Sequence, residues 1–239
     1  MLFLGPISGI VLLYVFAAIF PALFLMRYIY QEDKADKEPS GLLINLVIKG
    51  VFAALAAIVL ELIMHSVLGL FTYPNNTIKT IIDAFIGVGL IEEATKFFFL
   101  YKSTWYNLDF NYRFDGIVFA VFVSLGFAAF ENIQYIFTYG LSIALSRALF
   151  AIPAHMGFAV FMGLFYGRAK QRERRGDFFA MKFNLIMGYL AAVFLHGFYD
   201  SCAMINTDTA NIVFIAFVAI MYLIVFLTIR KESSQDQLL

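Results

Sequence analysis

DGIVFAVFVSLGFAAFENIQYIFTY, residues 115–139, contains no charged side chain between Asp115 and Glu131. An apolar helix of about 20 residues is long enough to cross the hydrocarbon core of a bilayer, so this stretch predicts a membrane-spanning helix. Its second half then places Glu131 and Asn132 at membrane depth. The fold therefore depends on how many such helices the chain contains, and the function depends on why one of them carries a buried acid.

The whole chain is more apolar than a soluble domain. Hydrophobic residues fill 62% of its 239 positions, Phe alone occurs 29 times, and charged residues make up only 14%. A water-soluble fold of this size cannot bury so much apolar surface. We expect one integral-membrane domain, 1–239, folded as an all-α polytopic bundle of about seven transmembrane helices with a site-bearing core at about 79–203. The expected spans are about 3–27, 42–71, 79–101, 115–139, 145–168, 183–203 and 210–229.

Lysine and arginine are distributed unequally between the two sets of loops. Three follow the first span, two lie between the third and fourth, six lie between Arg168 and Lys182, and two follow the last span. The opposite loops carry only Lys79 and Arg147. The positive-inside rule therefore predicts an external N-terminus and a cytosolic C-terminus. Because topology explains the basic clusters and the net charge is +0, no nucleic-acid partner is expected.

Several polar residues fall inside the expected spans, where ionisable groups are costly and usually mark a functional site. At about 1.5 Å per helical residue, Glu92 lies roughly 20 Å below the outer surface, His155 roughly 15, Glu131 roughly 12 and His196 roughly 10. Four helices thus bring acids and imidazoles to a similar middle layer. The full set is Glu92, Glu93 and Lys96 in the third span, Glu131 and Asn132 in the fourth, His155 in the fifth, and His196 and Asp200 in the sixth.

The local spacings indicate which of these side chains work together. Lys96 follows Glu92 by four residues and Glu93 by three, so its ammonium can reach either carboxylate. We expect Lys96 to pair mainly with Glu92 and to leave Glu93 as the freer acid or base. His196 and Asp200 are also four apart, so the carboxylate can orient the imidazole, or both can hold one metal or water. Paired carboxylates with two histidines are sufficient to activate water against a carbonyl.

Other polar residues have more ordinary interpretations. Glu61 and His65 lie four apart near the outer end of the second span and are expected to form a structural pair. Arg147 falls near the outer start of a helix, where an interfacial role is the default. Pro153 should bend the fifth span and free a backbone carbonyl.

The polar layer alone leaves two classes of function open, a hydrolase centre and a proton- or cation-coupled transporter or relay. A transporter of this kind usually shows inverted repeats and matching broken helices, and the sequence contains neither. The residues therefore favour the hydrolase without excluding the relay.

Four segments carry a resemblance to a known family. Over roughly residues 85–203, the chain resembles the PrsW family of bacterial intramembrane proteases, which is related to the CAAX-prenyl-protease and bacteriocin-immunity group. Lys96, Glu131 and Asp200 stand where the CAAX branch usually has arginine, histidine and asparagine, and they favour PrsW over a CAAX-type or bacteriocin-immunity protease with another substrate. The segments are IEEATKFF (91–98), FDGIVFAVFVSLGFAAFENIQYI (114–136), RALFAIPAHMGFAVFMGLFYGRAK (147–170) and FLHGFYD (194–200).

The resemblance implies site-1 cleavage of a membrane-anchored anti-sigma factor, a single-pass protein of the bacterial cell membrane, as the step that starts release of a stress sigma factor. The family is often described as metalloproteases, and His155, His196 and Glu131 are the candidate Zn²⁺ triad with an open fourth position. A metal-free site in which His196 or Asn132 steadies the oxyanion is the alternative. The implied catalytic residues are Glu92, Glu93, Glu131, His155, His196 and Asp200, with Lys96 and Asn132 in support.

Overall fold

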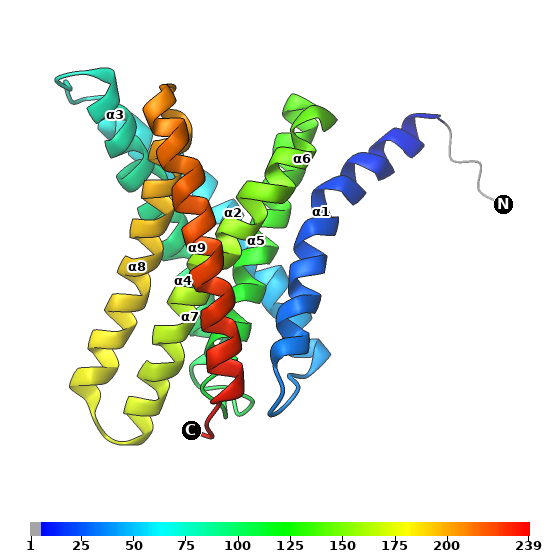
Figure 1. The fold of residues 1–239 in the computed structure, drawn as a ribbon, viewed down its shortest axis with the longest axis vertical. Helices are drawn as coiled ribbons and strands as arrows, with labels where there is room; N and C mark the ends of the chain where they lie inside the picture. The colour runs from blue at the N-terminus through cyan, green and yellow to red at the C-terminus, as the bar shows by residue number, and fades with distance from the viewer. Residues whose placement is uncertain (1–5) are drawn as a thin grey trace.

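The computed structural model describes residues 6–239, so the first residues of the expected span 3–27 lie outside it. Figure 1 shows a bundle of long helices. Within the described residues the only strand-like pairing is an isolated bridge between Tyr112 and Leu238. The α-helices are α1 (Pro6–Glu32), α2 (Ser40–Leu68), α3 (Asn76–Ile82), α4 (Leu90–Thr104), α5 (Asp115–Tyr139), α6 (Ala144–Ser146), α7 (Ile152–Arg174), α8 (Phe178–Met204) and α9 (Asp208–Ser234). The remaining helical elements are two π-helical turns, η1 (Asp83–Gly89) and η3 (Arg147–Ala151), and a 3₁₀ turn, η2 (Leu141–Ile143).

The prediction of an all-α membrane bundle is confirmed. Within residues 6–239, six helical segments are long and apolar enough to cross a bilayer: Gly9–Glu32, Ser40–Leu68, Asp115–Tyr139, Leu141–Arg174, Phe178–Met204 and Asp208–Ser234. The expected span 79–101 is the composite segment α3–η1–α4. This segment carries Glu92, Glu93 and Lys96, which explains why a criterion of length and apolarity does not select it. Large apolar side chains such as Phe24, Leu62 and Ile212 are exposed on the outside of the bundle, as a lipid-facing surface requires.

The connections between helices gather at two ends of the bundle (Figure 1). One end carries α3, α6 and the α8–α9 connection, and we call it the cavity end. The other carries the loops 33–39, 105–114 and 175–177 together with the C-terminus, and we call it the tail end. By the predicted orientation the cavity end is external and the tail end is cytosolic.

Helix α5 is the centre of the bundle. Every residue from Asp115 to Ala128 is buried, so this helix is enclosed on all sides and needs no polar face. Small residues allow its neighbours to approach closely. A β-carbon on Gly116 would lie only 2.6 Å from the backbone nitrogen of Gly167 in α7. Gly163 and Gly167 form the small-xxx-small pattern that membrane helices use for close packing.

Each of the two most polar site helices is preceded by a π-helical turn. In η1 the irregular backbone ends at Gly89, shortly before the glutamate pair, and η3 ends shortly before Pro153 near the start of α7. The hydroxyl of Tyr222 in α9 lies 2.9 Å from the carbonyl oxygens of both Leu149 and Phe150. Leu149 is the residue four before Pro153, whose ring has no N–H to donate to that carbonyl, and α9 supplies a donor to it instead.

Candidate active site

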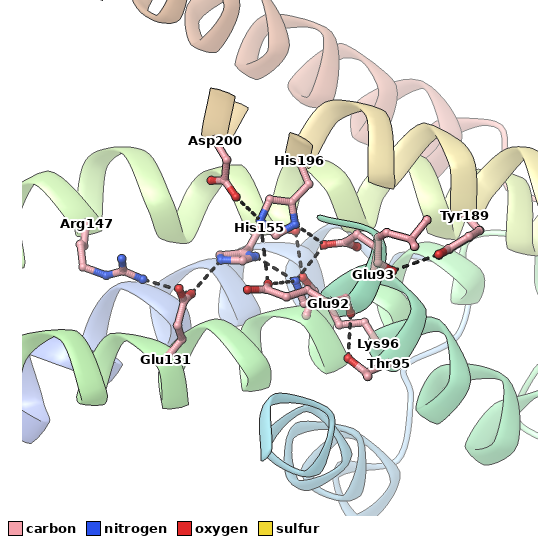
Figure 2. A network of polar contacts seen from close by, with 12 residues as sticks. Glu92, Glu93, Thr95, Lys96, Glu131, Arg147, His155, Tyr189, His196 and Asp200 are labelled. Carbon is pink, nitrogen blue, oxygen red and sulfur yellow. Dashed lines mark hydrogen bonds and ion pairs between the residues drawn. The ribbon is translucent and has the colours of Figure 1, made fainter. Parts of the chain in front are cut away.

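Polar side chains from four helices meet in one buried network beneath the cavity end (Figure 2). Helix α4 contributes Glu92, Glu93 and Lys96, and all three are buried. Helix α7 contributes His155, which is also buried, and α5 contributes the half-buried Glu131. Helix α8 contributes His196 and Asp200, which lie one helical turn apart. The structure therefore brings the predicted acids and imidazoles together, as the estimated depths indicated.

Lys96 is the hub of the network. Its ammonium donates to Glu92 Oε2 at 3.0 Å and to Glu93 Oε1 at 2.8 Å. It also lies 3.1 Å from His155 Nδ1 and 4.0 Å from the centre of the Phe127 ring. A lysine ammonium has only hydrogen-bond donors, so one positive charge is shared between two carboxylates and a neutral imidazole nitrogen. This sharing offsets much of the cost of burying the two carboxylates.

The contacts of His155 define its tautomer. Because Lys96 can only donate, His155 Nδ1 is the acceptor and the ring proton is on Nε2. That Nε2–H lies 3.0 Å from Glu131 Oε2, which accepts it. The backbone carbonyl of His155 in turn accepts from Ser124 Oγ at 2.9 Å, which ties α7 to α5. His155 thus links the carboxylates of α4 to the carboxylate of α5.

His196 lies between carboxylates on both ring nitrogens. Its Nδ1 is 2.8 Å from Glu93 Oε1, and its Nε2 is 3.3 Å from Asp200 Oδ2 and 3.9 Å from Glu92 Oε2. The ring of Phe158 stacks on the imidazole at 4.8 Å between centroids. Asp200 therefore orients the imidazole, as the four-residue spacing predicted.

The expected division between the two glutamates is wrong. Glu93 makes the shorter contact with Lys96 and is the glutamate that His196 contacts at 2.8 Å, while Glu92 lines the cavity. Adjacent helical residues point about 100° apart, so only one of them can face the cavity. Helix α8 supplies His196 on the side of Glu93, and helix spacing within α4 alone could not reveal that neighbour.

A cavity of about 770 Å³ borders the network. Its walls include the site residues Glu92, Glu131, His155, His196 and Asp200. It also reaches the ends of α2, α5 and α8 and the start of α9, where it is lined by His65, Tyr135, Met204 and Phe214. All of those residues belong to the cavity end, so the site is approached from that end. The space is large enough for a segment of extended peptide together with water.

Two residues given ordinary roles from sequence line this cavity as well. Arg147 in η3 lies 3.1 Å from Glu131 Oε2, and its guanidinium stacks over Tyr135 at 3.8 Å, so it is part of the network and not only an interfacial residue. Glu61 does not bond His65 within the described residues, and its buried Oε1 has no hydrogen-bond partner. The expected Glu61–His65 structural pair is therefore wrong. The sequence contained one indication that Arg147 belongs to the network: it precedes His155 by eight residues, about two helical turns.

Asn132 lies outside the cavity. Its side-chain nitrogen donates to the carbonyl of Ala18 in α1 at 2.8 Å, and its Oδ1 accepts from Arg147 Nε at 2.5 Å. It therefore holds Arg147 in place, and the contacts give it no direct reach to an oxyanion. Both of its polar groups are already used.

Four side chains could hold one metal ion, and they differ in part from the expected triad. One ligand atom from each of Glu92, Glu93, His155 and His196 lies within 4.8 Å of the others. Glu131 is not in this group and instead accepts a hydrogen bond from His155 Nε2. Glu93 Oε2 is buried without a hydrogen-bond partner, which leaves a free ligand atom inside the group. Two carboxylates and two imidazoles are ligands that zinc and similar ions accept, so the residues fit a metal.

The sequence of the chain is similar to those of known proteins. A family profile described as PrsW family intramembrane metalloprotease matches residues 38–229. "Protease PrsW" of Halalkalibacterium halodurans is 30% identical over 92% of this chain and 97% of the relative. "Protease PrsW" of Oceanobacillus iheyensis is 36% identical over 77% and 80%, and that of Clostridioides difficile is 32% identical over 86% and 85%. No solved structure matches the chain.

Proposed function

This chain belongs to the PrsW family of intramembrane metalloproteases and is a multi-pass bacterial membrane protease, and we propose that it performs site-1 cleavage of a membrane-anchored anti-sigma factor. One observation supports the proposal most strongly. A buried network of acids and imidazoles lies at the floor of a cavity of about 770 Å³ that opens at the predicted external end. A site-1 protease must reach its substrate from that side of the membrane.

The network divides the work of hydrolysis between its carboxylates. Glu92 lines the cavity, so it is the residue that accepts a proton from the attacking water and passes it toward the leaving amine. Glu93 bonds Lys96 and His196 and fixes their positions. His196 lines the same cavity, and its two ring nitrogens contact Glu93 and Asp200, so it fixes the positions of these carboxylates beside the attacking water.

Glu131 and Arg147 form the second half of the site. Glu131 accepts the Nε2 proton of His155 and lies beside the Arg147 guanidinium. This arrangement keeps His155 neutral and in one tautomer, with Nδ1 directed toward Lys96. A metal held by Glu92, Glu93, His155 and His196, with Zn²⁺ as the proposed ion, would take the place of the Lys96 ammonium at His155 Nδ1 and the two carboxylates, and would supply Lewis-acid activation of water and of the scissile carbonyl.

The substrate class follows from the setting of the cavity. A single-pass helix can pack beside the bundle in the bilayer, and its external end would then lie at the level of the cavity end. Peptide bonds are accessible to water attack only where the helix has unwound, which is easiest near that end. We therefore place the cleaved bond close to the external membrane surface.

The predicted orientation has its own test. A reporter fused after Arg175, in the loop between α7 and α8, is expected in the cytosol, and one inserted next to Asn76, at the start of α3, is expected outside. Both reporters on the same side of the membrane would contradict the seven-span arrangement.

The function itself is tested by reconstitution. Parent protein and a Glu92→Gln/Glu93→Gln variant are placed in liposomes with a single-pass anti-sigma factor, and cleavage is followed by mass spectrometry. We expect a cut near the external surface with parent protein only. The competing proton- or cation-relay predicts ion flux in the same liposomes without cleavage, and that result would overturn the proposal.

A further inference from the structure

A second cluster of acids lies at the tail end, far along the bundle from the intramembrane network. One carboxylate oxygen from each of Asp33, Asp115 and Asp236 lies within 4.8 Å of the others. Asp33 is in the loop between α1 and α2, Asp115 begins α5, and Asp236 is in the C-terminal tail after α9. Three segments distant in sequence therefore present carboxylates to one point. Glu38, from the same loop as Asp33, is buried beside Asp115.

The oxygens of this cluster are buried and lack partners. Asp33 and Asp115 are fully buried, and Glu38 is 5% exposed. Both carboxylate oxygens of Asp33, one of Asp115, one of Glu38 and one of Asp236 have no hydrogen-bond partner. The side-chain oxygen of Asn111, in the loop that precedes α5, is also buried without a partner. Buried polar oxygens are almost always satisfied, so six such atoms in one region need an explanation.

Protein cations do not supply the missing partners. Lys37 contacts the backbone carbonyls of Tyr30 and Asp33. Arg113 pairs with Glu232 at 2.9 Å. Among the described residues no ion pair reaches a carboxylate of the cluster.

We propose that Asp33, Asp115 and Asp236, with Glu38 and Asn111 at the periphery, form a binding site for a hard divalent cation of the Mg²⁺ or Ca²⁺ class. Such ions take six or more oxygen ligands from carboxylates, amide carbonyls and water. Ligand distances of about 2.0–2.1 Å for Mg²⁺ and 2.3–2.6 Å for Ca²⁺ place oxygens on opposite sides of the ion about 4–5 Å apart, and the three oxygens lie within 4.8 Å of one another. The site contains no nitrogen or sulfur ligand among the described residues, so a softer ion such as Zn²⁺ is disfavoured.

The site would fasten the C-terminal tail to the body of the protein. Asp236 Oδ1 already accepts from the backbone nitrogen of Phe114 at 2.9 Å. The backbone nitrogen of Arg113 donates to Gln237 O at 2.9 Å, and that of Leu239 donates to Asn111 O at 2.7 Å. The tail therefore lies as a strap across the loop before α5, and a cation would connect this strap to the α1–α2 loop through Asp33. At a cytosolic tail end, Mg²⁺ is the ion that this inference favours.

The binding test uses full-length protein in detergent, stripped with a chelator and titrated calorimetrically with MgCl₂ and, separately, with CaCl₂. The variant is Asp33→Asn, and the matched control is Asp36→Asn, an exposed acid of the same loop whose replacement keeps a side-chain oxygen to accept from Asn111 Nδ2. Both leave the intramembrane network unchanged, so the difference between them reports on the tail end alone. We expect parent and Asp36→Asn to bind equally and Asp33→Asn to bind at least tenfold more weakly.

A second measurement, proteolysis of the C-terminal tail, distinguishes loss of the cation site from misfolding of the variant. Carboxypeptidase trimming of the last residues should slow when the cation is added to parent protein, and the cation should have no such effect on Asp33→Asn or Glu38→Gln. Equal binding by Asp33→Asn and Asp36→Asn would overturn the proposal. So would a parent protein that binds neither ion at millimolar concentration, because the acids would then be held together by shared protons.

Discussion

The intramembrane network and the tail-end acidic cluster both bury carboxylates, but they differ in whether cationic side chains contact those carboxylates. In the network, Glu92, Glu93 and Glu131 each lie within about hydrogen-bond distance of Lys96, Arg147 or a histidine. In the tail-end cluster, no cationic side chain among the described residues forms an ion pair with Asp33 or Glu38. The network therefore carries its own counter-charge, whereas the cluster leaves that role to an ion from solution.

This difference explains what each region can do. An acid beside a lysine and a histidine can exchange protons with them during a reaction without leaving a lone buried charge. Acids without such partners are held together only when a cation or proton joins them, so they suit a structural clamp. Residues of the intramembrane network line the cavity, and residues of the tail-end cluster do not. Chemistry is thus expected at one end of the bundle and stabilisation at the other.

Removing Lys96 would make the network resemble the tail-end cluster and should have the largest effect. Lys96→Met leaves Glu92 and Glu93 buried without their shared cation. We expect a loss of about 3–5 kcal/mol in the free energy of unfolding, the usual cost of breaking a buried ion pair. Thermal or denaturant unfolding in detergent measures it. The double variant Lys96→Met/Glu93→Gln should recover part of the loss, and no recovery would contradict the shared-charge interpretation.

Removing Arg147 should weaken the second half of the network more modestly. Arg147→Gln deletes a charged partner of Glu131, an interaction of about 1.5–3 kcal/mol. If that stabilisation operates in the transition state, kcat should fall by about ten- to a hundredfold. Arg147→Lys restores the charge but not the planar contact with both Glu131 and Asn132, and should recover activity in part. A change in KM alone, with kcat intact, would assign Arg147 to substrate binding instead.

The smallest effect is expected where α9 supports the bend before α7. Tyr222→Phe removes the hydroxyl that satisfies the carbonyls of Leu149 and Phe150 and should cost about 1 kcal/mol of stability. Cleavage should stay near the parent rate, because no atom of Tyr222 lines the cavity. A large loss of activity in a stable Tyr222→Phe protein would show that η3 moves during turnover.

The sequence predicted the helical membrane fold well because hydrophobic length is a local property of the chain. The uninterrupted apolar run before Glu131 predicted α5 at 115–139, the same bounds that the structure gives. The composite segment α3–η1–α4 was also found, although its polar residues lower its apolarity. The π-helical turns were not predicted, because they depend on tertiary packing around Gly89 and Pro153 rather than on composition.

The site residues were harder to assign than the fold. Spacing along α4 predicted that Lys96 would reach Glu92 and Glu93, and both contacts are present. It could not predict that Glu93, rather than Glu92, makes the close contact with His196 of α8. Arg147 and Asn132 were misplaced for a related reason. Their contact joins α5 to η3, and a single sequence does not show which helices are neighbours.

The most direct test of the central claim compares two carboxyls that line the same cavity, Glu92 and Glu61. Glu92→Gln and Glu61→Gln are each reconstituted in liposomes with the anti-sigma factor, and initial cleavage rates are measured at equal amounts of folded protein. Loss of an acid or base that activates water lowers the rate by about 10² or more. The account predicts that loss for Glu92→Gln and a rate near that of the parent for Glu61→Gln. Equal rates for the two variants would contradict the assignment of the Glu92 network as the hydrolytic centre.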